Sequence, residues 1–245
     1  MEWHKRFVQQ AAWTRELRLY LFKRAGMPTA RRVLEVGCGT GAILSGLPTN
    51  AAVHGLDSEP ARLAEARRHA PQAKLTCGNA HCLPYASGLF DITFCHFLLL
   101  WVGNPLQALR EMKRVTCPGG SILALAEPDY NARVDKPDEL ARLGRWQAES
   151  LQRQGADPAV GSHLPELFRQ AGIRLIETGN LHPDGGHPPG PGERALEWAV
   201  LEADLAGMVP AAEIQRLKQL DEVAWLRGER VLHVPTYWMM GGCDG

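Results

Sequence analysis

Three glycines at alternate positions form the most informative segment of this sequence. Gly37, Gly39 and Gly41 directly follow the apolar run 33–36, in which Glu35 is the one charged residue. Glycine tolerates positive φ angles and lets a ligand approach the backbone closely. Open α/β sheets bind their ligands beside the carboxyl ends of the strands. We therefore expect a ligand to bind at this loop.

The spacing of the glycines helps to identify the ligand. Loops that bind dinucleotides follow the pattern G-x-G-x-x-G, but here the third glycine comes one position early and position 42 is Ala. The carboxylate of Glu35 would repel a pyrophosphate and attract a cationic sulfonium that carries an amino group. A nicotinamide-dependent oxidoreductase therefore remains only as a less favoured alternative.

Asp57 is the second candidate for ligand binding. It ends the next apolar run, 57 − 41 = 16 residues after Gly41. A carboxylate at this point can accept two hydrogen bonds from the diol of a ribose. Alternatively, Asp57 could cap the helix that we expect to open at Pro60. The two roles do not exclude each other.

The elements that position these residues alternate between strand and helix patterns. Strands are predicted at 32–36, 51–56, 73–76, 91–95 and 121–126, and helical segments at 42–47, 59–69 and 104–116. Strands that alternate with helices indicate a parallel sheet with helices on both faces. Right-handed crossovers make such a sheet doubly wound.

The flanking regions complete the predicted fold. One helix is expected over 2–25, and Pro165 is expected to open another over 164–171. The remaining predicted elements are helices at 138–155, 193–206 and 211–227, strands at 173–177 and 231–240, and a Pro/Gly loop at 182–193. We predict an α/β fold: a Rossmann-like, doubly wound, mostly parallel seven-stranded sheet with an N-terminal helix and a helical insertion before the last strand.

Six segments carry a resemblance to a known family. They are LEVGCGTG (34–41), GLDSEP (55–60), GNAHCLPY (78–85), FDITFCHFLLLWV (90–102), ALREMKRVTCPGG (108–120) and AEPDY (126–130). In this order and spacing the sequence resembles the class I S-adenosylmethionine (SAM)-dependent methyltransferases, in the branch of ubiquinone/menaquinone-biosynthesis and small-molecule methyltransferases. The resemblance is looser beyond residue 130, where such families differ in substrate.

The resemblance implies which residues contact SAM. Asp57 would hold the ribose hydroxyls, and Asn79 would face the adenine at a position where the family usually has Asp. An Asn carbonyl can still accept the bond from the adenine amino group, without charge assistance. The full set of implied cofactor contacts is Glu35, Gly37, Cys38, Gly39, Gly41, Asp57, Ser58, Asn79, Ala80 and His96.

The reaction that the resemblance implies needs alignment more than acid–base chemistry. Methyl transfer from a sulfonium is an in-line displacement, and orientation alone can supply several kcal/mol. A general base matters only if the acceptor is a hydroxyl or an acidic carbon. By position His96 is the best candidate for such a base, and Glu127 is the second. Each could instead be a hydrogen-bonded wall or strand-end residue.

The chain is expected to be a single domain with three parts. Residues 1–30 would form a lid helix, 31–130 the SAM-binding core, and 131–245 the substrate cover and final strands. The expected function is methyl transfer from SAM to a small-molecule O, N or C nucleophile, which releases S-adenosylhomocysteine. A SAM-binding protein without catalysis is the main alternative, since Asn79 departs from the family pattern.

Composition narrows the possible partners. The 245 residues include 27 basic and 27 acidic side chains, a balance that argues against a nucleic-acid partner. No apolar run is long enough to span a bilayer, and the first residues lack the apolar stretch of a secretory signal. Because the six cysteines form no CxxC pair, we expect reduced thiols, a cytoplasmic protein and no metal site.

Overall fold

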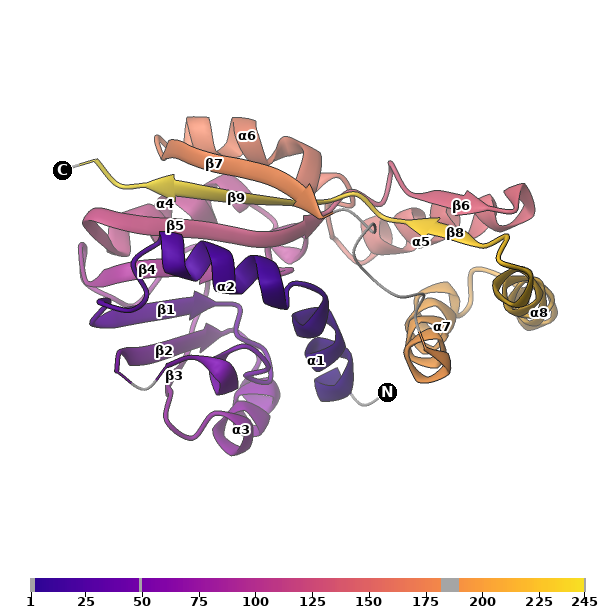
Figure 1. The fold of residues 1–245 in the computed structure, drawn as a ribbon, viewed down its shortest axis with the longest axis horizontal. Coiled ribbons are helices and arrows are strands. Elements are labelled where there is room, and N and C mark those ends of the chain that lie inside the picture. Colours follow the sequence, from indigo (N-terminus) through magenta and orange to yellow (C-terminus); the bar gives the residue numbers. More distant parts are fainter. Residues whose placement is uncertain (1–2, 49, 182–189, 245) are drawn as a thin grey trace.

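A seven-stranded sheet organises the computed structural model, which describes residues 3–48, 50–181 and 190–244 (Figure 1). Its strand order is β3-β2-β1-β4-β5-β9-β7. Strands β1 to β5 pair in parallel, and β9 runs antiparallel to both of its neighbours. The predicted mostly parallel, doubly wound sheet is therefore confirmed. Its strands are β1 (Arg32–Val36), β2 (Ala52–Asp57), β3 (Lys74–Cys77), β4 (Phe90–Cys95), β5 (Thr116–Pro128), β7 (Arg174–Leu181) and β9 (Thr236–Gly242).

Helices cover both faces of this sheet. The helices are α1 (Trp3–Trp13), α2 (Arg15–Arg24), α3 (Pro60–His69), α4 (Pro105–Val115), α5 (Ala141–Arg153), α6 (Val160–Gln170), α7 (Pro191–Leu205) and α8 (Ala211–Arg227). Side chains alternate across a strand, so Leu34 packs with the α4 and α6 side of the core and Val33 with the α2 and α3 side. Glu35, two residues after Val33, consequently lies on the α2 side.

Two segments form a second layer beyond the carboxyl ends of the parallel strands (Figure 1). We call residues 131–153 and 190–233 the cover. The first segment contains β6 (Val134–Lys136) and α5, and the second contains α7, α8 and β8 (Val231–His233), which pairs antiparallel with β6. The cover has its own apolar core, which includes Leu143, Trp198 and Leu217. The predicted helical insertion before the last strand is present as α7 and α8.

Two predicted elements differ from the structure near the ligand-binding edge. The helix expected over 2–25 is two helices, separated at Thr14. The helix expected over 42–47 is only a short 3₁₀ turn, Leu44–Gly46. Pro48 explains the second difference, because the residue before a proline is driven out of the α region, and Leu47 is extended with ψ 148°. Too few residues remain after Gly41 for a stable helix.

Other differences have local causes in packing and in proline. Helix α6 begins at Val160, and Pro165 lies inside it instead of opening it. The buried repeat Val160, Leu164 and Phe168 holds that helix against the core despite the missing backbone donor. The predicted last strand is divided at Pro235 into β8 and β9, and β6 was not predicted. Most of the predicted Pro/Gly loop, residues 182–189, lies outside the described residues.

None of the helices that the structure describes is long and apolar enough to cross a bilayer.

Candidate active site

A cavity of about 410 Å³ lies at the carboxyl ends of β1, β2 and β4, between the sheet, α1 and the cover. This volume is typical of small-molecule sites. Eight of the predicted site residues line it: Glu35, Gly37, Cys38, Gly39, Asp57, Ser58, Ala80 and His96. The structure therefore gathers most of the predicted residues around one space. Gly41, Asn79 and Glu127 are not among the described residues that line it.

The glycine loop presents bare backbone to this cavity. Gly37 and Gly39 have φ angles of 75° and 51°, which favour glycine. A Cβ on Gly37 would lie 2.6 Å from Leu98 Cδ1, and one on Gly39 would lie 3.2 Å from Phe7 Cε2. The amides of Gly37 and Cys38 both donate to the carbonyl of Leu56, at 2.7 and 2.9 Å. The loop is thus held against β2, and its backbone faces the cavity.

Gly41 serves packing instead of ligand binding. Its φ is 79°, and a Cβ there would lie 3.3 Å from the Cβ of Ala66 and 3.4 Å from that of Ala70. These two alanines belong to α3 and the residue after it. The third glycine therefore lets α3 pack closely against the loop, and the cofactor contact expected for Gly41 has no geometric support.

Asp57 ties the glycine loop to the start of α3. Its Oδ2 accepts the Gly39 N–H at 2.8 Å, and its Oδ1 accepts the Glu59 N–H at 2.9 Å. The helix cap is Glu59, whose side chain accepts the Ala61 N–H, so the expected alternative role of Asp57 as the α3 cap is wrong. A carboxylate has about four lone-pair sites, and each Asp57 oxygen therefore retains capacity for a donor from the cavity.

Glu35 is a buried acid with an unused oxygen. Its side chain is only 3% exposed, and none of the residues that the structure describes gives its Oε2 a hydrogen-bond partner. Burial raises the pKa of this carboxyl well above its ordinary value, and the nearby Arg18 opposes the rise. Unpartnered buried polar atoms are rare in native proteins. A cationic donor in the cavity would both pair with this oxygen and favour its charged form.

His96 joins the cavity wall to the junction between α1 and α2. Its Nε2 lies 2.9 Å from Thr14 Oγ1, at the residue that separates the two helices, and Arg18 donates to the same hydroxyl. Burial and the charge of Arg18 lower the pKa of His96 to about 3. An effective general base has a pKa near the working pH. The arrangement therefore favours a neutral His96 that anchors the helix junction over the expected catalytic base.

Glu127 supports the cavity wall from below. It is fully buried, and its Oε1 and Oε2 accept the N–H groups of Leu98 and Leu100 at 3.0 and 3.3 Å. The segment 97–101 that it holds does line the cavity, and it begins with the positive φ of Phe97, 51°. The expected catalytic role of Glu127 is not supported, because these amides occupy its carboxyl away from the cavity. We regard it as a positioning residue.

The raised pKa of Glu127 allows a test of whether its carboxyl is buried as described. Burial raises that pKa to about 7. Between about pH 4.5 and about pH 7, the unfolded chain releases this proton while the folded protein keeps it, so the free energy of unfolding falls as pH rises. The free energy of unfolding of Glu127→Gln should not fall in this way, because glutamine carries no titrating proton. We therefore expect the free energy of unfolding of the variant, relative to that of wild type, to rise by up to about 3 kcal/mol across that interval.

Urea unfolding near both ends of the interval measures this difference. The exposed Glu139 offers a matched control, because Glu139→Gln makes the same chemical change at the surface and should follow wild type at both pH values. A Glu127→Gln variant that kept the pH slope of wild type would show that Glu127 ionises normally.

Asn79 is turned toward its own loop. It is exposed, and its Oδ1 accepts the His81 N–H at 2.9 Å. Its neighbours Gly78 and Ala80 do line the cavity. The structure therefore places Gly78 and Ala80 on the cavity wall and Asn79 in a local turn beside it.

One face of α1 lines the cavity, within the segment 1–30 that the sequence predicts to form a lid helix. Trp3, Phe7 and Gln10 contribute to the wall together with Arg6, and these positions follow the helical spacing i, i+3, i+4, i+7. Their mixed polarity concealed that period. Trp13, the other aromatic residue of α1, is exposed and stacks under Arg6 at 4.8 Å.

The cover supplies the remaining wall. Gln147 and Leu151 come from α5, Val200 and Asp204 come from α7, and Tyr130 and Gln154 lie directly beside the cover. The cavity thus runs from the glycine loop to a second group of side chains, in the part of the chain where the sequence predicts a substrate cover.

Comparison with known proteins places this geometry in context. Residues 34–124 match the family described as a methyltransferase domain. The malonyl-[acyl-carrier protein] O-methyltransferase of Halorhodospira halophila is 39% identical over 99 residues, 38% of this chain and 34% of that protein. The demethylmenaquinone methyltransferase of Renibacterium salmoninarum is 36% identical over 161 residues, 64% of this chain and 66% of that protein. The chain therefore spans between a third and two thirds of the length of these two relatives.

The fold is similar to solved structures over almost the whole chain. One of them is phosphoethanolamine N-methyltransferase 2 of Haemonchus contortus in complex with S-adenosyl-L-methionine. The TM-score is 0.61 at 18% sequence identity, and the match covers 94% of this chain and 53% of that protein. At this identity the similarity concerns the fold, and it includes the cover as well as the sheet.

Proposed function

We propose that this chain, whose residues 34–124 form a class I methyltransferase domain, transfers a methyl group from SAM to a small-molecule acceptor. S-adenosylhomocysteine is the product of that transfer. The known relatives that carry out methyl transfer support this proposal, as does the arrangement of the cavity.

The unpartnered oxygen of Glu35 is the observation that carries the proposal. SAM presents an ammonium group and a sulfonium, and a buried carboxyl without a partner suits such a cation. Gly37 and Gly39 line the cavity with Glu35 and present only backbone there, which lets a ligand approach closely. The free lone pairs of Asp57 suit a ribose diol. These features also disfavour a dinucleotide, whose pyrophosphate would lie near Glu35.

SAM, when bound, supplies a methyl group that its sulfonium already activates. The chain itself would then orient the acceptor and exclude water, which can contribute several kcal/mol to catalysis. Phe7 of α1 and Leu98 of the segment held by Glu127 form parts of the wall suited to that task. His96, neutral at physiological pH, would hold α1 and α2 over the site through Thr14.

Two further features support a small acceptor and a cytoplasmic location. The cavity continues past the glycine loop to Gln147 and Asp204 in the cover, which favours methyl transfer over SAM binding alone. All six cysteines are free thiols, as is typical of proteins in reducing compartments.

Calorimetric titration tests the cofactor part of this proposal. We expect S-adenosylhomocysteine to bind with micromolar affinity and NADH to give no signal, because Glu35 selects a cationic ligand over an anionic one. Binding of NADH alone would favour the oxidoreductase. Binding of S-adenosylhomocysteine without turnover of any acceptor in a broad screen would favour a SAM-binding protein without catalysis.

A further inference from the structure

The cover places three polar side chains on the cavity wall. Gln147 belongs to α5, Gln154 directly follows that helix, and Asp204 belongs to α7. Nearby apolar walls come from Leu151 and Val200. An acceptor that enters this part of the cavity therefore meets one acid and two amides set in an apolar surface.

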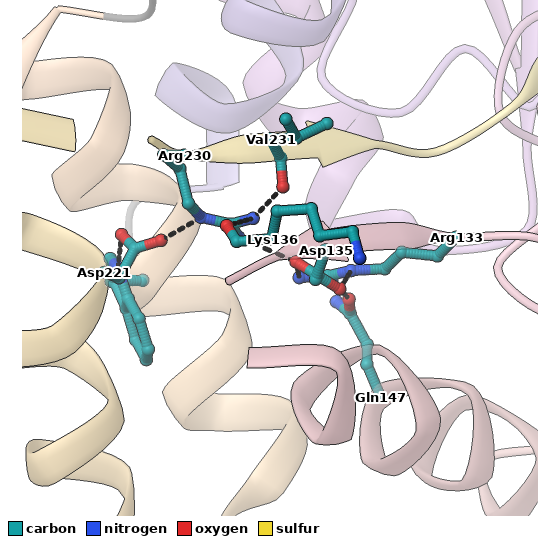
Figure 2. A network of polar contacts seen from close by, with 8 residues as sticks. Arg133, Asp135, Lys136, Gln147, Asp221, Arg230 and Val231 are labelled. Atoms are coloured by element: carbon teal, nitrogen blue, oxygen red, sulfur yellow. Dashed lines mark hydrogen bonds and ion pairs between the residues drawn. The ribbon is translucent and has the colours of Figure 1, made fainter. Parts of the chain in front are cut away.

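A chain of buried ion pairs leads to one of these side chains (Figure 2). Arg230 donates to Asp221 and, at 2.7 Å, to Asp135. Asp135 also accepts two bonds from Arg133, at 2.8 and 3.0 Å. The side chains of Arg230 and Asp135 are only 2% and 1% exposed. Arg133 then donates to Oε1 of Gln147, so the ionic chain ends at the cavity wall.

This contact fixes the orientation of the Gln147 amide. A guanidinium has donors only, so the carbonyl oxygen of Gln147 must face Arg133. The amide nitrogen of Gln147 then faces Asp204 and donates to its Oδ2 at 2.9 Å. Buried charges thereby hold Gln147 as a donor toward Asp204.

Asp204 is a partly buried acid: burial raises its pKa, and hydrogen bonds from Gln147 and Gln154 and the charge of nearby Arg6 oppose the rise. Its neighbour Arg6 is paired with Glu197, and Arg133 and Arg230 are paired with Asp135 and Asp221. No ion pair joins Asp204 to another of the residues that the structure describes. Its hydrogen bonds come from two neutral amides, Gln147 at Oδ2 and Gln154. A carboxylate has about four lone-pair sites, so Asp204 retains capacity to accept a bond from the cavity.

Two aromatic side chains at the cavity mouth indicate that the ligand has an apolar part. Trp3 and Trp101 line the cavity and remain 47% and 48% exposed. Large aromatic side chains at an opening suit apolar or aromatic ligands. This observation is independent of Asp204.

We propose that Asp204 selects the methyl acceptor: an apolar molecule whose hydroxyl or amino group donates a hydrogen bond to this carboxylate. Acceptors that present a carboxylate or a phosphate here are rejected, because like charges placed together at a binding site cost several kcal/mol. Gln147 and Arg133 are positioning residues for Asp204. This inference rests on the proposed function, and it names the class of acceptor.

A matched pair of probes tests the inference on the full chain loaded with S-adenosylhomocysteine. The probes are para-propylphenol and para-propylbenzoate, which share their apolar part and differ in charge. We expect the phenol to bind at least about tenfold more tightly in wild type, and Asp204→Asn to remove most of that difference. Ligand-observed NMR titration measures both affinities. A preference of wild type for the benzoate, or no binding of the phenol at millimolar concentration, would overturn the inference.

Glu202→Gln is the matched control for this variant. It removes one negative charge from the same helix, but Glu202 pairs with Lys218 and is not among the described lining residues. We expect it to retain the selectivity of wild type, and equal loss in both variants would assign the effect to overall charge. Binding of S-adenosylhomocysteine, measured on the same samples, separates the two proposals. If it binds normally while selectivity is absent, only the assignment of Asp204 fails.

Discussion

Replacement of Arg230 by methionine is expected to lower the free energy of unfolding by about 3–5 kcal/mol. Arg230 lies between Asp221 and Asp135, and both of its ion pairs are almost completely buried. Methionine fills similar space but leaves two carboxylates in the interior without their shared cation. The cost of an unpaired buried charge exceeds the modest net value of the pair itself. Urea unfolding followed by circular dichroism measures the change.

The exposed ion pair Arg216–Glu213 provides the control. Arg216 is 53% exposed, and exposed pairs contribute about 0–1 kcal/mol. Arg216→Met should therefore unfold nearly as wild type does. Equal effects of the two substitutions would mean that the Arg230 pairs are solvated in solution and do not organise the cover.

Asp57→Ala should weaken the binding of S-adenosylhomocysteine by about 1–3 kcal/mol, or about fivefold to 150-fold. The substitution removes two contributions at once. The ribose would lose a carboxylate acceptor, and the amide of Gly39 would lose the bond that shapes the glycine loop. Isothermal titration calorimetry of the folded variant measures the affinity.

Glu59→Gln is the control for a general effect of this turn on binding. Glu59 is an exposed residue of the same turn, and it caps α3 without lining the cavity among the described residues. Its substitution should leave the affinity close to that of wild type. If Asp57→Ala bound S-adenosylhomocysteine as tightly as wild type, Asp57 would have no part in ribose binding.

Features set by neighbours in the chain were predictable before the structure. Strand β1 matches its predicted bounds because an apolar run beside glycines has one reasonable conformation. Asp57 and the glycine loop meet because parallel neighbours align their carboxyl ends at one edge of the sheet. Local signals did not predict every element correctly. Pro48, two residues after a short 3₁₀ turn, prevents the helix expected over 42–47.

Side-chain roles that depend on distant partners were not predictable in this way. Glu127 was expected to follow the strand 121–126 but lies within β5, and its bonds to the amides of Leu98 and Leu100 show that it supports the wall and does not face the cavity. Gly41 belongs to the predicted loop, but contact with Ala66 assigns it to packing. In each case the residue type allows both roles, and only the partner distinguishes them.

The sequence by itself determined the sheet, the ligand-binding edge and the chemistry of the glycine loop, because these depend on local backbone preferences and on the order of the strands. The tertiary structure decided how α1 closes the site and which groups meet the acceptor. Gln147 and Asp204 come from separate helices, and their orientation depends on Arg133, Asp135 and Arg230. Buried charged groups pair with residues that are distant in the sequence, and the sequence pattern does not show which of them will be in contact.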